Sequence, residues 1–318
     1  MASPAILKAG REKETQAADR YALLMRVSLI GATLLVSGLG LWWMLGPLRA
    51  GLWQLWTTNG LASIGMLFPL AAIVLAMRVW RQESWSAKGT WRGLPLCTVA
   101  LLLASIVNEA GYPFFAFQRF TLQLFPVGLL VFVYVSGVVL LFLGHTAYRL
   151  ALFPISLLLF LNPAPRVFTT FVDLPLQYAA AHTARTFAQW IGVTTAVDDL
   201  RLMFSPSLGM FIAPGCNGLR GALTMGFLTM IVAHIYRMPI LQRIVYVTSG
   251  VILAYLLNLL RLCTLVLCYR VAIGFAPLAH HMEAADYVLG GLIFFVAAVF
   301  VIATPRIWNR LGQQYTSS

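Results

Sequence analysis

Hydrophobic residues along the chain occur in long runs that are separated by short polar segments. A run of about 20 apolar residues is the length that an α-helix needs to cross a bilayer. Because lipid offers no hydrogen-bond partners, the backbone inside such a run has to be helical. The pattern therefore predicts an all-α, polytopic transmembrane helical bundle with about eight spans, at roughly 26–46, 60–78, 94–110, 121–144, 150–163, 216–236, 244–268 and 286–304.

The fifth run and the loop after it depart from this simple pattern. The fifth run is short and bounded by prolines, so a partly re-entrant segment is the alternative to a full crossing. The following loop, 164–215, contains LPLQYAAAHTARTFAQWIGV, in which apolar and small residues recur at helical spacing. We predict an outer amphipathic helix with a small-residue face, which lies along the interface or packs over the bundle. Alternation and a Pro-Ser-Leu-Gly turn signal in 193–214 predict a short hairpin.

Composition and charge narrow the class of protein. With 60% hydrophobic and 10% charged residues, the chain is outside the range of soluble domains. The net charge is +12, and the basic residues lie between the hydrophobic spans. We therefore expect these residues to contact anionic membrane lipids, and we expect no binding of nucleic acid. Of the 22 basic residues, 14 fall on the side of the N-terminus. The positive-inside rule then predicts a multi-pass protein of the cytoplasmic membrane with both termini in the cytoplasm.

The first run follows a charged segment, as in a signal peptide, but it has no small-residue cleavage site and is expected to stay as a span. The four cysteines, Cys97, Cys216, Cys263 and Cys268, form no CxxC pair and no metal-binding spacing, so we expect no metal and no cofactor. Three of them lie in apolar runs and are typical of core residues. Cys216 differs from them, because it lies in a short polar and glycine-rich segment between Gly215 and Asn217.

Three groups of polar residues lie at or near span ends, where an ionisable residue is a hypothesis of function. They are Cys216, Asn217, Gly218 and Arg220 at the start of the sixth span, Asn258 and Arg261 in the seventh, and His280 and His281 before the eighth. The seventh span starts inside, and Arg261 lies about 25 Å along it at 1.5 Å per residue, near the outer edge of the bilayer core. The topology therefore predicts that a cysteine, an arginine and a histidine meet on the outer side.

Such a trio is suited to acyl transfer. A cysteine thiolate attacks a carbonyl, a histidine moves the proton to the leaving amine, and a cationic donor stabilises the oxyanion. Cys216 at a helix start would have its thiol activated, and Arg220 four residues on would share its helix face. Asn258, three residues before Arg261, would orient the guanidinium. Each residue also has a simpler interpretation: a packed cysteine, an arginine at the headgroups and solvated histidines.

The same residues resemble the exosortase/archaeosortase family of membrane cysteine transpeptidases over about residues 90–305. The resemblance rests on the proline-bounded LALFPISLLLFLNPAPRVF, on LPLQYAAAHTARTFAQWIGV, on the cysteine motif APGCNGLRGA, on NLLR and on a histidine before GGLIFF. It implies that Cys216 is the nucleophile, that Arg261 is the catalytic arginine and that His280 or His281 is the proton carrier. Two departures are Asn217, where serine is usual, and Asp286, which stands where the family's histidine usually does. Asp286 or Glu283 would orient the histidine ring.

The resemblance also implies a substrate class and a domain organisation. The substrates would be exported proteins whose C-terminal sorting tail holds a Pro-Glu-Pro-like motif, a transmembrane helix and a basic cluster. The tail's helix would sit among the spans, and exopolysaccharide machinery is a possible partner. Residues 1–90 would form an N-terminal segment with two spans, 91–305 the catalytic membrane domain and 306–318 a cytoplasmic tail. The alternative is a non-proteolytic exopolysaccharide-assembly factor or a transporter that binds an anionic lipid-linked substrate through outer arginines.

Overall fold

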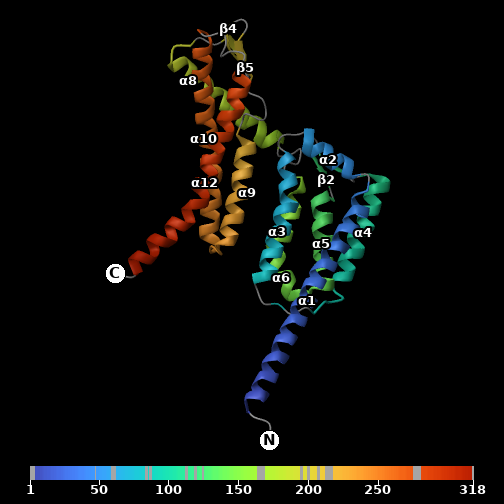
Figure 1. Cartoon of the computed structure of the whole chain (residues 1–318). Coiled ribbons are helices and arrows are strands. Elements are labelled where there is room, and N and C mark those ends of the chain that lie inside the picture. Colours follow the sequence, from blue (N-terminus) through green and yellow to red (C-terminus); the bar gives the residue numbers. More distant parts are fainter. Residues whose placement is uncertain are drawn as a thin grey trace. The chain divides into compact units, whose positions relative to one another are not determined.

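The computed structural model divides the chain by its internal contacts into two units, Met1–Pro163 and Ala164–Ser318. The residues that it describes are 4–46, 48–58, 62–82, 85, 88–111, 114–117, 120–123, 125–162, 169–193, 196–198, 201–205, 208–211, 218–274 and 281–316. Helices dominate both units (Figure 1). The predicted fold class, a polytopic helical bundle, is confirmed.

The first unit is a bundle of antiparallel helices with one small hairpin (Figure 1). Its elements are α1 (Pro4–Leu45), α2 (Leu48–Thr58), η1 (Ala62–Met66), α3 (Leu67–Gln82), α4 (Gly93–Ala110), β1 (Phe114–Phe117), β2 (Phe120–Gln123), α5 (Val127–Phe142), α6 (Gly144–Ser156) and η2 (Leu157–Leu161). The strands β1 and β2 pair antiparallel, with Phe114 opposite Gln123 and Phe117 opposite Phe120.

Small residues bring the helices of the first unit close together. A side chain at Gly93 on α4 would overlap the carbonyl oxygen of Gly137 on α5, so only glycine allows this approach. Tyr134 of α5 donates a hydrogen bond of 2.9 Å to the carbonyl of Val36 on α1. A Cβ at Gly40 would overlap the same tyrosine. Glycines therefore fix both crossings: at α4–α5 they let the two backbones approach, and at α1–α5 Gly40 leaves room for the side chain of Tyr134.

The second unit contains the long helices α10 and α12 and the shorter helices α8 and α9, with a small sheet near α8 at one end (Figure 1). Its elements are η3 (Thr169–Asp173), α8 (Leu174–Trp190), β3 (Ala196–Asp198), β4 (Arg201–Ser205), β5 (Leu208–Phe211), α9 (Leu219–Ile235), α10 (Ile240–Ala272) and α12 (Met282–Thr316). The strands form an antiparallel sheet of order β3-β4-β5. The hairpin predicted in 193–214 is confirmed by the pairing of β4 with β5.

The small-residue face predicted for the outer helix is where α8 packs on the bundle. Four alanines of α8 are buried in one cluster with residues of α10 and β4, namely Ala180, Ala181, Ala184, Ala188, Leu202, Leu262, Leu265 and Val266. The ring of Phe204 on β4 stacks on Tyr269 of α10 with centroids 5.1 Å apart. Of the two predicted placements, packing over the bundle is the one observed, and the opposite face leaves Trp190 83% exposed.

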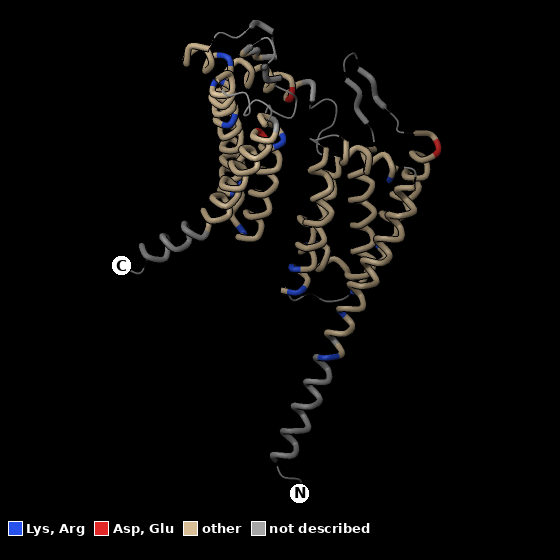
Figure 2. The backbone as a smooth tube through the Cα atoms, turned by 45° about the horizontal axis from the view of Figure 1, so that its top comes forward, with Lys and Arg blue, Asp and Glu red and all other residues tan. Residues whose placement is uncertain are grey.

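All eight predicted spans correspond to helical segments of the described chain. Six of the segments are long and apolar enough to cross a membrane, namely Leu23–Leu45, Ala62–Gln82, Gly93–Ala110, Gly144–Leu161, Ile240–Ala272 and Ala284–Pro305. Two apolar helices are shorter, namely Val127–Phe142 and Leu219–Ile235. Lys and Arg residues gather toward the ends of the helices, and the central parts of the bundles carry few charges (Figure 2). This distribution is typical of helices whose middle lies in lipid.

Two predicted boundaries were wrong. The fourth span was expected from residue 121, but β2 occupies Phe120–Gln123 and α5 begins at Val127. Pro126 precedes α5 with an extended backbone and provides no amide hydrogen, so the helix cannot extend back through it. The sixth span was expected from residue 216, but α9 begins at Leu219 because Gly218 has a left-handed backbone with φ of 83°.

Candidate functional site

A cavity of about 680 Å³ lies among α9, α10 and α12 of the second unit. Its walls change character along the helices. One end is lined by polar residues, glycines and one tyrosine, namely Gly218, Arg220, Gly221, Thr224, Asn258, Arg261, Asp286, Tyr287, Gly290 and Gly291. The other end is mostly apolar and is lined by Met225, Ala254, Leu257, Ile293, Phe294 and Ala297. The cavity therefore offers a polar head and an apolar continuation.

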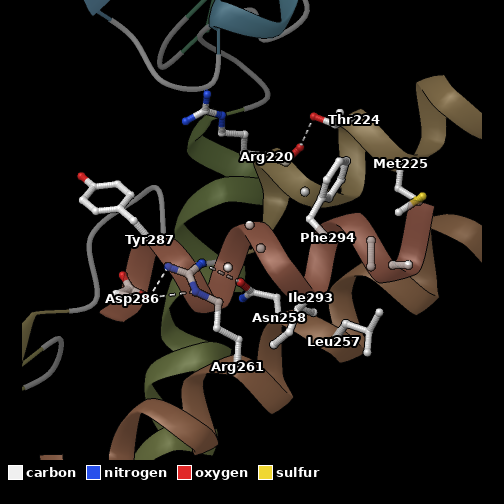
Figure 3. Close-up of a pocket in the computed structure, with 16 residues that line it drawn as sticks. Arg220, Thr224, Met225, Leu257, Asn258, Arg261, Asp286, Tyr287, Ile293 and Phe294 are labelled. Atoms are coloured by element: carbon white, nitrogen blue, oxygen red, sulfur yellow. Dashed lines mark hydrogen bonds and ion pairs between the residues drawn. The ribbon is translucent and has the colours of Figure 1, made fainter. Parts of the chain in front are cut away.

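An ion pair between two helices forms the polar end (Figure 3). The Nε of Arg261 on α10 donates a hydrogen bond of 2.8 Å to Oδ1 of Asp286 on α12. The Nη2 of Arg261 pairs with the same carboxylate oxygen. The third guanidinium nitrogen, Nη1, reaches Oδ1 of Asn258 at 3.5 Å. The guanidinium is thus oriented by a carboxylate on one side and an amide on the other.

The local sequence explains why these groups meet. Asn258 and Arg261 are three residues apart and share a face of α10, as predicted. Gly290 lies one turn after Asp286 on α12, and a Cβ there would be 3.1 Å from Nε and 3.2 Å from Cζ of Arg261. Gly218 leaves similar room, because a Cβ there would be 2.8 Å from Nδ2 of Asn258. Two glycines therefore shape the space around the arginine and its amide neighbour.

The ion pair is largely shielded from solvent. The side chain of Arg261 is 17% exposed and that of Asp286 is 26% exposed. Two charges near the membrane core are tolerated when they compensate each other, since an isolated charge there is costly. Asp286 therefore explains how a fixed arginine can be held at this depth in a largely apolar bundle.

The structure brings together five of the residues predicted for the site. Gly218, Arg220, Asn258, Arg261 and Asp286 all line the cavity. His281, in contrast, directly precedes α12; it is exposed and does not line the cavity. Its backbone carbonyl accepts a hydrogen bond of 2.9 Å from the amide of Ala285. Cys216, Asn217 and His280 lie outside the described residues.

One predicted relation between site residues needs correction, and another stays a prediction. Cys216 and Arg220 were expected to share a face of one helix, but α9 begins at Leu219, after the left-handed Gly218, so helical spacing does not relate them. Asp286 pairs with Arg261; that Asp286 or Glu283 orients a histidine ring stays a prediction, because His280 lies outside the described residues. Gly221, Gly290 and Gly291 were not predicted as site residues; the signal in the sequence was glycine within apolar helices, where it weakens the helix.

Among the residues that the structure describes, no three or more His, Cys, Asp or Glu side chains gather as metal ligands do. The chemistry that these residues offer is recognition of negative charge. Arg261 presents fixed donors in a shielded space, and Arg220 adds a second cation on the wall of the same cavity. Donors of this kind stabilise a carboxylate, a phosphate or a developing oxyanion.

These features define a multi-pass membrane protein with a polar site in a helical bundle. The chain belongs to the transmembrane exosortase family, because the family model (Exosortase_EpsH) matches residues 56–304, more than half of the sequence. The match contains all the cavity-lining residues and begins earlier than the resemblance seen in the sequence. No curated protein and no solved structure matches the chain. Family membership supports a transpeptidase-type role in the membrane.

Proposed function

We propose that the protein is an integral membrane cysteine transpeptidase or protease that cleaves the C-terminal sorting tail of exported proteins. The observation that carries the proposal is the shielded, oriented Arg261 in a cavity whose wall begins at Gly218, two residues after Cys216 in the sequence. A family of membrane transpeptidases provides the reaction class. The cavity provides a place where an anionic transition state would be stabilised.

The reaction would start from the thiolate of Cys216. Its Sγ attacks the carbonyl carbon of the scissile peptide and forms a tetrahedral oxyanion. The carbon–nitrogen bond then breaks, and His280 or His281 delivers a proton to the leaving amine. The enzyme keeps the acyl group as a thioester on Cys216. Water resolves it to a carboxylate, or an amine acceptor resolves it to a new amide, and either step restores the thiol.

Arg261 would be the electrostatic component of this reaction. Its guanidinium donates hydrogen bonds to the oxyanion or to an acidic residue of the tail motif. Asp286 and Asn258 act as positioning residues, because they fix the plane of the guanidinium before the substrate arrives. A donor that is already oriented loses little energy to reorganisation during the reaction.

The positive-inside pattern supports the orientation that we propose for this site. Both termini would lie in the cytoplasm, and the Arg261 end of the cavity would face the outer side of the cytoplasmic membrane. A substrate tail would then keep its basic cluster in the cytoplasm and present its Pro-Glu-Pro-like motif at the outer face. Anionic lipids would surround the basic helix ends, and exopolysaccharide machinery would be a downstream partner.

One observation favours a second candidate. Arg220 and Arg261 line the same cavity, and two cations would also bind the phosphates of a lipid-linked sugar. The protein would then be a non-proteolytic assembly factor or a transporter for exopolysaccharide. In that case Cys216 would not take part in the activity.

The test is mass spectrometry of a co-expressed protein that carries a sorting tail, with wild type, Cys216→Ala and Arg261→Ala. We expect cleavage by wild type, no cleavage by Cys216→Ala and strongly reduced cleavage by Arg261→Ala. A Cys97→Ala variant is the matched control, because Cys97 is buried in the first unit and is expected to be dispensable. Equal cleavage by wild type and Cys216→Ala would exclude the nucleophile and favour the assembly factor.

A further inference from the structure

Two glycines on the cavity wall have no close neighbour among the residues that the structure describes. A Cβ at Gly221 of α9 or at Gly291 of α12 would meet no heavy atom of those residues within 4 Å. Other helical glycines of this unit are different: a Cβ at Gly226 would be 2.9 Å from Val251, and one at Gly250 would contact Thr229 at 2.5 Å. Since glycine weakens a helix relative to alanine, Gly221 and Gly291 call for another explanation.

The two glycines line the cavity from two different helices, Gly221 from α9 and Gly291 from α12. The α12 wall runs from Asp286 to Ala297, which corresponds to about 16 Å of helix, or three turns. Gly291 and Arg220 line the cavity and are both exposed, so the polar half of the cavity reaches the surface of the described chain. The walls beyond Gly291 are apolar, with Phe294 half-buried among them.

This geometry suits an apolar helix better than a lipid chain. Helices approach each other closely in membranes where glycine or another small residue removes the side chain between the two backbones. An acyl chain adapts to walls of any shape and needs no glycine. At one end, the two arginines Arg220 and Arg261 outnumber the carboxylate Asp286, and this net positive charge complements an acidic residue that adjoins such a helix.

We propose that this cavity is the groove that binds the transmembrane helix of the substrate's sorting tail, with Gly221 and Gly291 at the points of closest approach. The proposal rests on the proposed function for the identity of the substrate. It adds the surface that recognises the tail: the helix lies against α9 and α12, and its acidic end meets Arg261. The groove thereby holds the scissile bond at the polar end of the cavity.

The experiment uses the full chain with Cys216→Ala, which keeps the tail intact. Benzoylphenylalanine replaces Phe294, which lines the cavity, or Phe295, which is 66% exposed and does not line it. The probe is a co-expressed fusion whose tail holds a Pro-Glu-Pro motif, about 20 apolar residues and a basic cluster. After illumination, we expect the tail's helix to be crosslinked from position 294 at about ten times the yield at position 295, as a tenfold occupancy preference would give.

Equal crosslinking of the tail's helix from both positions would contradict the proposed groove. Crosslinking of position 294 only to phospholipid or to the protein's own chain would contradict it as well. Cleavage by wild type is measured in parallel. If wild type cleaves the fusion and position 294 does not capture its helix, the groove is wrong and the proposed function stands. If position 294 captures the helix and wild type does not cleave the fusion, the groove stands and the proposed function is wrong.

Size complementarity provides a second measurement with an activity readout. Gly291→Leu and Gly221→Leu should raise KM about tenfold and leave kcat nearly unchanged, since they remove binding without touching the reacting groups. A smaller residue at the apposed position of the tail's helix should restore KM. Gly38→Leu on α1 is the control, because a Cβ there also meets no atom within 4 Å and Gly38 does not line the cavity. Failure of every tail variant to restore KM would contradict direct contact.

Discussion

Asp286 is the residue on which the orientation of Arg261 depends, because both Nε and Nη2 of the arginine pair with one of its oxygens. Asp286→Asn keeps the size of the side chain and removes its charge. We expect kcat to fall roughly 10- to 100-fold, as displaced catalytic groups typically cause. The measurement is cleavage kinetics of the tail-bearing fusion, in which kcat should change more than KM because a positioning residue acts mainly in the transition state.

The control for this variant is Glu109→Gln, which removes an exposed carboxylate at the end of α4 in the other unit. Its activity should equal that of wild type. Arg261→Lys extends the comparison, since lysine keeps the charge but lacks the planar fork that Asp286 and Asn258 hold. Full activity in Asp286→Asn or in Arg261→Lys would contradict the role of guanidinium orientation.

Gly290 gives a second prediction at the scale of one residue. In Gly290→Ala the new methyl group would lie 3.1 Å from Nε of Arg261, so the guanidinium has to shift by a few tenths of an ångström. We expect cleavage to fall several-fold. Folding stability should change little, because alanine favours the helix by about 0.5–1 kcal/mol and offsets the crowding. The measurements are cleavage rate and the melting temperature in detergent.

Gly38→Ala is the matched control for that variant, since no neighbour restricts position 38. It should gain the same helix stabilisation without any loss of activity. A large drop in melting temperature for Gly290→Ala would instead show that the glycine serves packing alone.

At the scale of elements, α8 is the helix that packs against α10 next to Arg261. Its alanine face packs on Leu262, Leu265 and Val266 of α10, directly after Arg261 in the sequence. Ala184 is fully buried there, so Ala184→Leu overfills the contact and should destabilise the protein by about 1–3 kcal/mol. We expect a lower melting temperature and a lower cleavage rate, because displacement of α10 moves Arg261.

Thr186→Leu is the comparison for α8, because Thr186 is exposed on the same helix. It adds a larger side chain without filling the α8–α10 contact and should leave cleavage unchanged. If both variants lost activity equally, α8 would act through its exposed face and not through its alanines.

These elements also show what the sequence could predict. The helical period of apolar and small residues was enough to predict α8 and its buried face, because alanine spacing alone decides which side can approach another helix closely. The start of α5 was missed, because the apolar character of Phe120–Gln123 continues into the helix and only Pro126 separates them. The pairing of Arg261 with Asp286 was also missed, because it joins residues on different helices and leaves no periodic signal.

At the scale of the whole molecule, the length of α10 relates the site to the membrane. Its 33 residues span about 50 Å, which exceeds a hydrocarbon core of about 30 Å. Arg261 lies 18 positions after Arg243, about 27 Å along the helix, so the two arginines match opposite edges of that core. The segment of α10 beyond Arg261 is the part that α8 and β4 cover. We therefore expect α8 to lie on the outer side, together with the Arg261 end of the cavity.

Cysteine labelling of intact cells tests this orientation in a Cys216→Ala background. Trp190→Cys places a thiol at the end of α8, at a position 83% exposed, and Pro239→Cys places one in the turn between α9 and α10. A membrane-impermeant maleimide should label position 190 in intact cells and position 239 only after lysis. Because basic residues near helix ends are retained in the cytoplasm, the turn with Arg237 and Arg243 should be protected. The reverse pattern would place the Arg261 end of the cavity in the cytoplasm, where it could not act on exported tails.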